Sequence, residues 1–149
     1  MSNNGNGTMG HGYYFEDLAV GMEASYAKKI TNEDVLAFAD LSGDTNPVHL
    51  NDAFAAGTIF KKRIAHGFLT GALFSTVLGT KLPGPGCIYL SQSLKFRAPV
   101  YIGDEVVATC KVTSLDAEKA RAVLACACQV NGKPVLEGEA VMMVSRKAS

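Results

Sequence analysis

The sequence has no excess of charge of either sign, and it has few charged residues overall. Lys plus Arg and Asp plus Glu each number 14, which gives a net charge of zero, and charged residues make up only 19% of the chain. A protein that binds nucleic acid through its phosphates needs a basic excess. Nucleic acid is therefore not an expected partner. The hydrophobic share of 48% excludes disorder over most of the chain, and 149 residues suit one domain.

Long apolar runs are also lacking. No stretch approaches the ~18 consecutive apolar residues of a membrane span, and the first dozen residues, MSNNGNGTMGHG, contain no apolar signal-peptide core. We predict a flexible tail over residues 1–12 and a single domain over residues 13–149, in a soluble cytoplasmic protein that does not enter a membrane. A neutral chain this apolar favours self-association, so we expect a homodimer or a larger homo-oligomer.

Several familiar site motifs are absent. The chain has no G-x-S-x-G elbow, no Walker loop and no G-x-G-x-x-G after a strand. The sequence therefore gives no support for an α/β-hydrolase, a P-loop nucleotide-binding protein or a Rossmann fold. The four cysteines lack Cys-x-x-Cys spacing and a neighbouring His, which argues against a metal site. We expect them to be reduced core thiols; they are Cys87, Cys110, Cys126 and Cys128.

Helices are predicted in the first half of the chain. TNEDVLAFADLSG has a cap at Thr31 or Asn32, acidic residues in its first turn and a stop at Gly43. Pro47 excludes the helical conformation at the residue before it, which predicts a turn over 44–46. A short helix is expected near 52–60. Apolar residues lie nearly all round the helix predicted over 66–82, which indicates burial on most of its sides.

Strands dominate the second half. The run over 87–96 alternates apolar and polar residues, as a half-buried strand does, and so do the runs 104–115, 121–130 and 134–146. Asn131-Gly132 joins the last two as a tight hairpin. A helix followed by four strands predicts an α+β fold with a largely antiparallel sheet.

Asp44 and His49 are the first candidate site. A carboxylate and an imidazole on one short loop stiffened by Pro47 can both reach a single water, one accepting its proton while the other orients it. The competing interpretation is that Asp44 caps a turn and His49 is an ordinary surface residue.

The second candidate is the start of the central helix. Gly67, Gly71 and Ser75 form a stripe without bulky side chains, and the Gly67 amide in the first turn points where an oxyanion would be stabilised. Close helix-to-sheet packing would also favour glycine there. A cluster of basic residues is interpreted as a face exposed to solvent, with contact to the phosphates of a long ligand as the alternative. The cluster comprises Lys61, Lys62, Arg63, Lys95 and Arg97.

LSGDTNPVH over 41–49, followed by IAHGF over 64–68, resembles the hydratase motif of the MaoC-like (R)-specific enoyl-CoA hydratases, most closely the PhaJ type. The resemblance extends from about Tyr14 to Val144. It implies a hot-dog fold, in which a long helix is wrapped by an antiparallel sheet, and a dimer whose sheets join. The only clear departure is the longer Gly/Asn-rich tail.

By this resemblance Asp44 and His49 are the catalytic pair, the Gly67 amide is the oxyanion donor, and Ser75 and Asn46 support the pair. The implied reaction is reversible hydration of a trans-2-enoyl-CoA to the (R)-3-hydroxyacyl-CoA. No metal and no prosthetic group is expected, because CoA belongs to the substrate.

Acyl length is expected to be set by apolar residues beside the central helix. The bulk at Leu69, Leu73 and Leu90 favours short-to-medium chains. Two alternatives remain open from the sequence: a hot-dog acyl-CoA thioesterase, and a non-catalytic acyl-binding module that would not depend on ionisable loop residues.

Overall fold

The computed structural model describes residues 10–148. Five helices and six strands are present in this part of the chain, and the first helix is a single 3-10 turn. In chain order they are η1 (Phe15–Asp17), β1 (Glu23–Lys29), α1 (Asn32–Ser42), α2 (Pro47–Leu50), α3 (Asp52–Ala56), α4 (Gly67–Thr80), β2 (Ile88–Gln92), β3 (Lys95–Phe96), β4 (Glu105–Asp116), β5 (Arg121–Val130) and β6 (Lys133–Met143).

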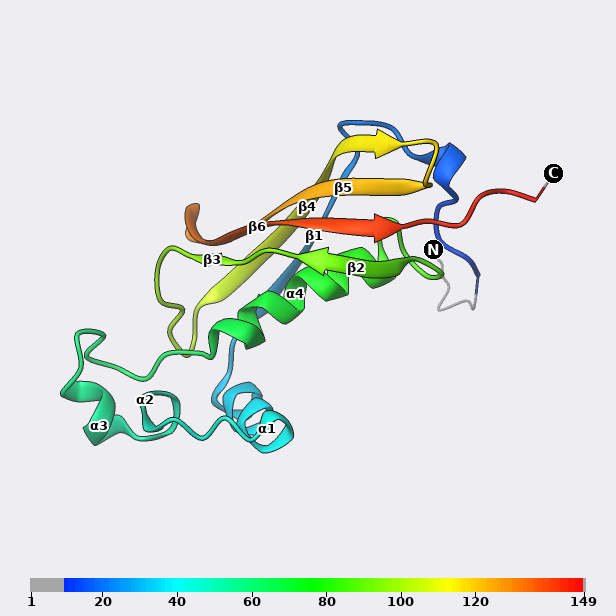
Figure 1. Cartoon of the computed structure of the whole chain (residues 1–149). Helices are drawn as coiled ribbons and strands as arrows, with labels where there is room; N and C mark the ends of the chain where they lie inside the picture. The colour runs from blue at the N-terminus through cyan, green and yellow to red at the C-terminus, as the bar shows by residue number, and fades with distance from the viewer. Residues whose placement is uncertain (1–9, 149) are drawn as a thin grey trace.

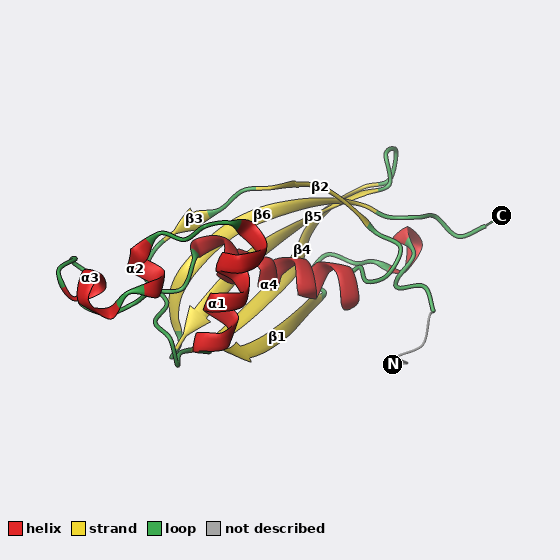
Figure 2. Cartoon of the chain, turned by 90° about the horizontal axis from the view of Figure 1, so that it is seen from below, coloured by secondary structure: helices red, strands yellow, loops and turns green. Residues whose placement is uncertain are grey.

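The strands form one antiparallel sheet in the order β1-β4-β5-β6-β2, and the short β3 also pairs with β6. Helix α4 packs on one face of this sheet, and α1 lies on the same side (Figures 1 and 2). The predicted alternation in β4 is confirmed, because its apolar face is fully buried; this face comprises Val106, Ala108, Cys110 and Val112. The α+β architecture is therefore as expected.

Local signals in the sequence fix two of the element boundaries. Thr31 caps α1 through a capping box with Asp34, and Gly43 ends the helix in the left-handed region at φ 80°. Asn131 and Gly132 have φ values of 51° and 77°, the positive pair that a type I′ hairpin requires. Both predictions are confirmed.

Burial of α4 differs from the prediction. Its buried residues are Thr70, Leu73, Phe74, Val77 and Leu78, which share one face, since they recur at spacings of three and four. The prediction of burial on most sides is wrong for the single chain. The sheet can cover only one face of a helix, and Phe68 is 68% exposed on another.

Two of the strands also depart from expectation. The predicted half-buried strand over 87–96 is divided into β2 and β3, and β2 is exposed along most of its length because it lies at the edge of the sheet. β1 was not predicted. Its half-buried face consists of Ala24, Tyr26 and Lys28, so its apolar alternation covers only two residues and is weaker than that by which the other strands are recognised.

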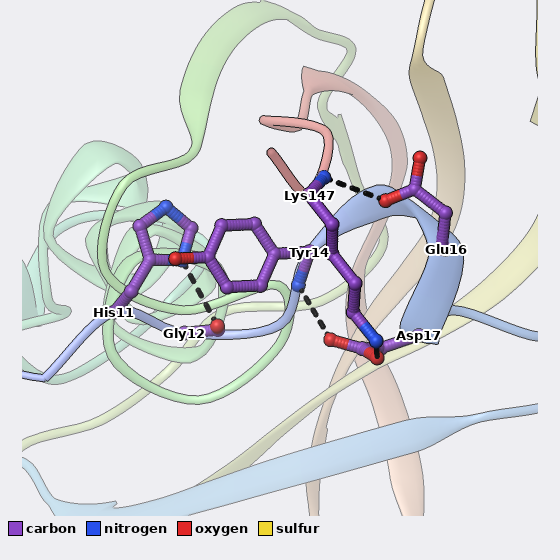
Figure 3. Close-up of polar contacts among 6 residues, drawn as sticks. All are labelled: His11, Gly12, Tyr14, Glu16, Asp17 and Lys147. Carbon is purple, nitrogen blue, oxygen red and sulfur yellow. Dashed lines mark hydrogen bonds and ion pairs between the residues drawn. The ribbon is translucent and has the colours of Figure 1, made fainter. Parts of the chain in front are cut away.

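The two ends of the described chain are joined (Figure 3). The Lys147 backbone N–H donates to Glu16 Oε1 at 2.8 Å, and Lys147 Nζ lies 2.8 Å from Asp17 Oδ1. The predicted flexible tail falls mostly on residues 1–9, outside the described residues. Its last residue, Gly12, is anchored, because its N–H donates to the Pro85 carbonyl at 2.8 Å.

The helices of the described chain are too short or too polar to cross a lipid bilayer.

Candidate active site

A tight loop after α1 presents Asp44. The left-handed Gly43 turns the chain out of the helix, and the Asp44 N–H then donates to Ser42 Oγ at 3.1 Å. Asp44 Oδ1 accepts the Asn46 N–H at 3.3 Å, a local bond typical of aspartate in turns. The carboxylate is exposed in the single chain. One of its oxygens is thus fixed by the loop.

Asn46 and Pro47 build the short helix that carries His49. Asn46 Oδ1 accepts the Val48 N–H at 3.1 Å, which caps the first turn of α2. Pro47 occupies the first helical position, where its missing N–H removes no hydrogen bond. Asn46 was expected to support the catalytic pair. It caps α2 and so fixes the backbone between Asp44 and His49.

His49 is 8% exposed, and both its ring and its backbone are held by the segment that follows α3. Its Nδ1 lies 2.8 Å from the Ile64 carbonyl, so Nδ1–H donates and Nε2 remains the proton acceptor. Its own carbonyl accepts Arg63 Nε at 2.7 Å, and Arg63 Nη2 donates to Asn32 Oδ1 at 2.7 Å. Burial lowers the pKa of His49, and the neighbouring His66 lowers it further, while the hydrogen bond to the Ile64 carbonyl and the charge of Asp44 oppose this shift. The imidazole is therefore neutral near pH 7.

The fold brings together Asp44, His49 and His66, since one polar side-chain atom from each lies within 4.8 Å of the others. The two imidazole rings stack with centroids 3.9 Å apart and an interplanar angle of 27°. One nitrogen of each ring is engaged with a backbone carbonyl, His49 Nδ1 with that of Ile64 and His66 Nε2 with that of Asp44. His49 Nε2 and the Asp44 carboxylate are left for acid/base chemistry on a water.

A cavity of about 500 Å³ opens beside this group, with His49 and Gly67 in its wall. Gly67 is the first residue of α4, so its N–H has no acceptor inside the helix and lies at the positive end of the helix dipole. The rest of the lining is mostly apolar, as an acyl group requires; it includes Phe60, Ile64, Phe68, Phe96, Pro99, Val100, Val135 and Leu136.

Ser75 lies apart from the pair in this chain. It is exposed on α4, eight residues beyond Gly67, which corresponds to ~12 Å along a helix. Its expected support of Asp44 and His49 stays a prediction. The residues expected to limit acyl length do not line the cavity: Leu73 is buried in the core, and Leu90 is exposed on β2. The expected lining by Leu69, Leu73 and Leu90 is therefore wrong for this cavity, whereas their effect on acyl length stays a prediction.

The basic cluster is split by the fold. Arg97 lines the main cavity and pairs with Glu137 at 2.7 Å. Lys61 and Lys62 line a second hollow of about 360 Å³ together with Arg63. Arg63 has a structural role through its bonds to α1 and α2, which its position in the sequence could not show.

Known proteins resemble this chain over most of its length. It is 55% identical to an (R)-specific enoyl-CoA hydratase of Rhodospirillum rubrum over 89% of the chain and 92% of the relative. It is 53% identical to a 3-hydroxybutyryl-CoA dehydratase of Methylorubrum extorquens over 90% of the chain and 85% of the relative. The unliganded R-hydratase PhaJ1 of Pseudomonas aeruginosa matches its structure with a TM-score of 0.86 and 44% identity, covering 91% of this chain and 88% of that one.

The structural match confirms the hot-dog fold. The MaoC like domain family matches residues 18–128, which include α1 to α4, the loop that presents Asp44 and most of the sheet. The chain therefore belongs to the MaoC-like domain family.

Proposed function

We propose that the protein is a hydro-lyase that adds water reversibly to a trans-2-enoyl-CoA and forms the (R)-3-hydroxyacyl-CoA. The water oxygen bonds to C3 of the acyl chain, and a proton is added at C2. The single observation that carries this proposal is the convergence of Asp44 with His49, which lines a largely apolar cavity that also has Gly67 in its wall. The names of the two relatives above support the same reaction.

Gly67 supplies the electrostatic part of the mechanism. Its N–H donates to the thioester oxygen, which makes C3 electrophilic and stabilises the negative charge that develops on that oxygen as water attacks. The 14 residues of α4 add the positive end of their dipole at the same point. This donor needs no rearrangement during the reaction, because the first helical residue has no acceptor within the helix.

Asp44 and His49 supply the proton transfers. Nε2 of the neutral His49 is free to accept the proton of the attacking water, while Nδ1–H stays on the Ile64 carbonyl. Asp44, held by the Asn46 N–H, binds the same water through its second oxygen. The pair then returns a proton to C2 on the same face. The two groups interact, so a pH profile reports the pair as a unit.

The first prediction tests this pair. We expect Asp44→Asn and His49→Gln to lower kcat for crotonyl-CoA by ~10²- to 10⁴-fold, the usual loss when one member of an acid/base pair is removed. The loss of the enoyl thioester is followed by absorbance, and chiral analysis of the 3-hydroxy product establishes the R configuration.

Thermal melting of both variants serves as the control for folding. Near-wild-type turnover by either variant would remove the assignment of the pair. Free thiol released from saturated acyl-CoA, without hydration of crotonyl-CoA, would instead support a thioesterase. Binding of acyl-CoA without turnover of either substrate would support a non-catalytic module.

The proposal includes the substrate's acyl length and the absence of a prosthetic group. The aromatic rings of Phe68 and Phe96 form part of the cavity wall, and one relative is named for a four-carbon acyl group, so we favour short-to-medium chains. Turnover across acyl lengths measures this preference. Hydration beside a thioester requires only acid/base groups and an oxyanion donor, so CoA would enter only as part of the substrate.

Cytoplasmic location and self-association also belong to the proposal. All four cysteines are free thiols, which is typical of a reducing compartment.

Strand β2 ends the sheet and exposes three large apolar side chains: Ile88, Tyr89 and Leu90. Unpaired edges with apolar side chains are sites of association, so a second copy of this chain is the proposed occupant.

A further inference from the structure

His66 is buried next to the proposed catalytic pair but does not line the cavity. It is 1% exposed and immediately precedes α4, with an extended backbone and no capping bond from its side chain. Its Nε2 lies 3.0 Å from the Asp44 carbonyl oxygen. Since a carbonyl can only accept, the proton of this bond is on Nε2. Nδ1 is buried and has no partner in the described part of the chain.

The His66 ring is also enclosed by rings from two other helices. Phe38 of α1 contacts it with centroids 4.8 Å apart, and His49 of α2 stacks on it at 3.9 Å. The residue thus connects the start of α4 with α1, with α2 and with the Asp44 loop. The bond to Asp44 joins residues 22 positions apart in the chain.

We propose that His66 is a positioning residue for hydration: its Nε2–H holds the Asp44 backbone, and its ring face orients His49, so that carboxylate and imidazole meet at one water. This inference rests on the proposed function. The short loop bonds of Asp44 fix its conformation but do not fix the loop relative to α4. The His66 bond does so, at the helix whose first amide binds the thioester oxygen.

Two substitutions separate the hydrogen bond from the ring. His66→Gln keeps an N–H that reaches the Asp44 carbonyl but removes the ring. His66→Phe keeps the ring but leaves the carbonyl without its donor. Misplacement of a catalytic group by about 1 Å lowers rates by ~10²-fold. We therefore expect the Phe variant to lose ~10²-fold in kcat with little change in KM, and the Gln variant to stay within ~10-fold of wild type.

The pH profile of kcat/KM separates a positioning role of His66 from a merely structural one, because a structural role would leave the profile unchanged. Asp44 and His66 face the His49 ring, and the Arg63 guanidinium binds the His49 backbone. Of these, His66 lowers the pKa of His49 and Asp44 raises it. Removing the second imidazole lets the pKa of His49 rise, so the base is protonated at a higher pH. The acidic limb of kcat/KM should shift upward in the Gln variant. It should shift less in the Phe variant, because the apolar ring keeps the burial that is the largest cause of the lowered pKa of His49.

Val77→Ala is the matched control, since Val77 is buried in α4, ten residues beyond Gly67, and does not line the cavity. It should lower the melting temperature and leave kcat and the acidic limb unchanged. Wild-type kcat and an unmoved limb in both His66 variants would overturn the inference while leaving the function intact. Absence of crotonyl-CoA hydration by the wild-type protein would overturn the function itself.

A measurement on the unmodified protein keeps the inference testable where a variant fails to fold. Nitrogen-15 NMR of histidine-labelled protein should show His66 as the Nε2–H tautomer and His49 as the Nδ1–H tautomer. A proton on Nδ1 of His66 would contradict the bond to Asp44, and with it the positioning role.

Discussion

Gly67 has no room for a side chain. A Cβ placed there would lie 2.5 Å from Phe96 Cε1 and 2.9 Å from Cζ. Phe96 is 50% exposed, so its ring can move without disturbing the core. Because the ring is part of the cavity wall, its movement would change the space next to the Gly67 amide. Glycine at this position thus serves the site more than the fold.

We predict that Gly67→Ala lowers kcat/KM for crotonyl-CoA by ~10-fold or more, as expected when a bound substrate is displaced from the reacting groups. The melting temperature should change little.

Gly71→Ala is the control, one turn further along α4, where a Cβ would meet Leu94 at an ordinary 3.6 Å. This change should stabilise the helix by ~0.5–1 kcal/mol and preserve activity. An equal loss of activity in both variants would contradict the special role of Gly67.

The sequence predicts the part of the candidate site that is made by residues close together in the chain. Asp44, Asn46 and His49 lie within six residues of the chain, and Gly67 marks the start of a helix. The part of the site made by distant residues was not predicted. His66 shares its dipeptide with Gly67, and nothing local shows that its ring meets the carbonyl of residue 44. Val135 and Leu136 reach the cavity from the last strand.

Among the secondary structure elements, β6 contains a glycine that the backbone between β2 and β3 approaches very closely. A Cβ on Gly138 would lie 1.9 Å from the Ser93 carbonyl oxygen. This atom belongs to the backbone between β2 and β3, where the Ser93 N–H donates to the Glu139 carbonyl and Ser93 Oγ accepts the Glu139 N–H, both at 2.9 Å. The backbone has to move if any side chain is added.

We predict that Gly138→Ala lowers the free energy of unfolding by ~1–3 kcal/mol, the usual range for overpacking. Denaturant titration measures this loss. Gly132→Ala does not serve as a matched control, because its positive φ adds strain of its own. Gly79→Ala does, since a Cβ there has no neighbour within 4 Å. Unchanged stability of Gly138→Ala would contradict the close approach.

Elements with strong local signals were predicted to within one to three residues at each end. Helix α1 has its capping residues, and β4, β5 and β6 have regular alternation around a short hairpin. β1 was missed because its small and polar residues give only a weak apolar alternation, through Ala24 and Tyr26. The exposure of β2 was missed because apolar alternation indicates a face that can be buried, whereas the position of the strand in the sheet decides whether it is.

At the scale of the whole molecule, the exposed apolar edge at β2 is the surface that a second copy of the chain would cover in the proposed assembly. We predict that the wild-type protein has the mass of a dimer or a larger homo-oligomer in solution, measured by light scattering. Ile88→Lys combined with Leu90→Lys should shift this mass toward the monomer, because both side chains are exposed along the edge and charge there opposes pairing.

Val20→Lys is the matched control for added charge, because Val20 is 63% exposed just before β1 at the opposite edge of the sheet. It should leave the mass unchanged. A wild-type protein with the mass of one chain would contradict the proposed assembly.

The two ends of the described chain meet at the pole remote from α2 and α3 (Figure 1), where Lys147 joins them. The cavity lies at the other pole, next to α2 and the first turn of α4. A resin, an electrode or a fused second enzyme attached through either end would therefore leave the entrance facing the solution. The molecule is suited to immobilisation, and to fusion with an enzyme that consumes its product.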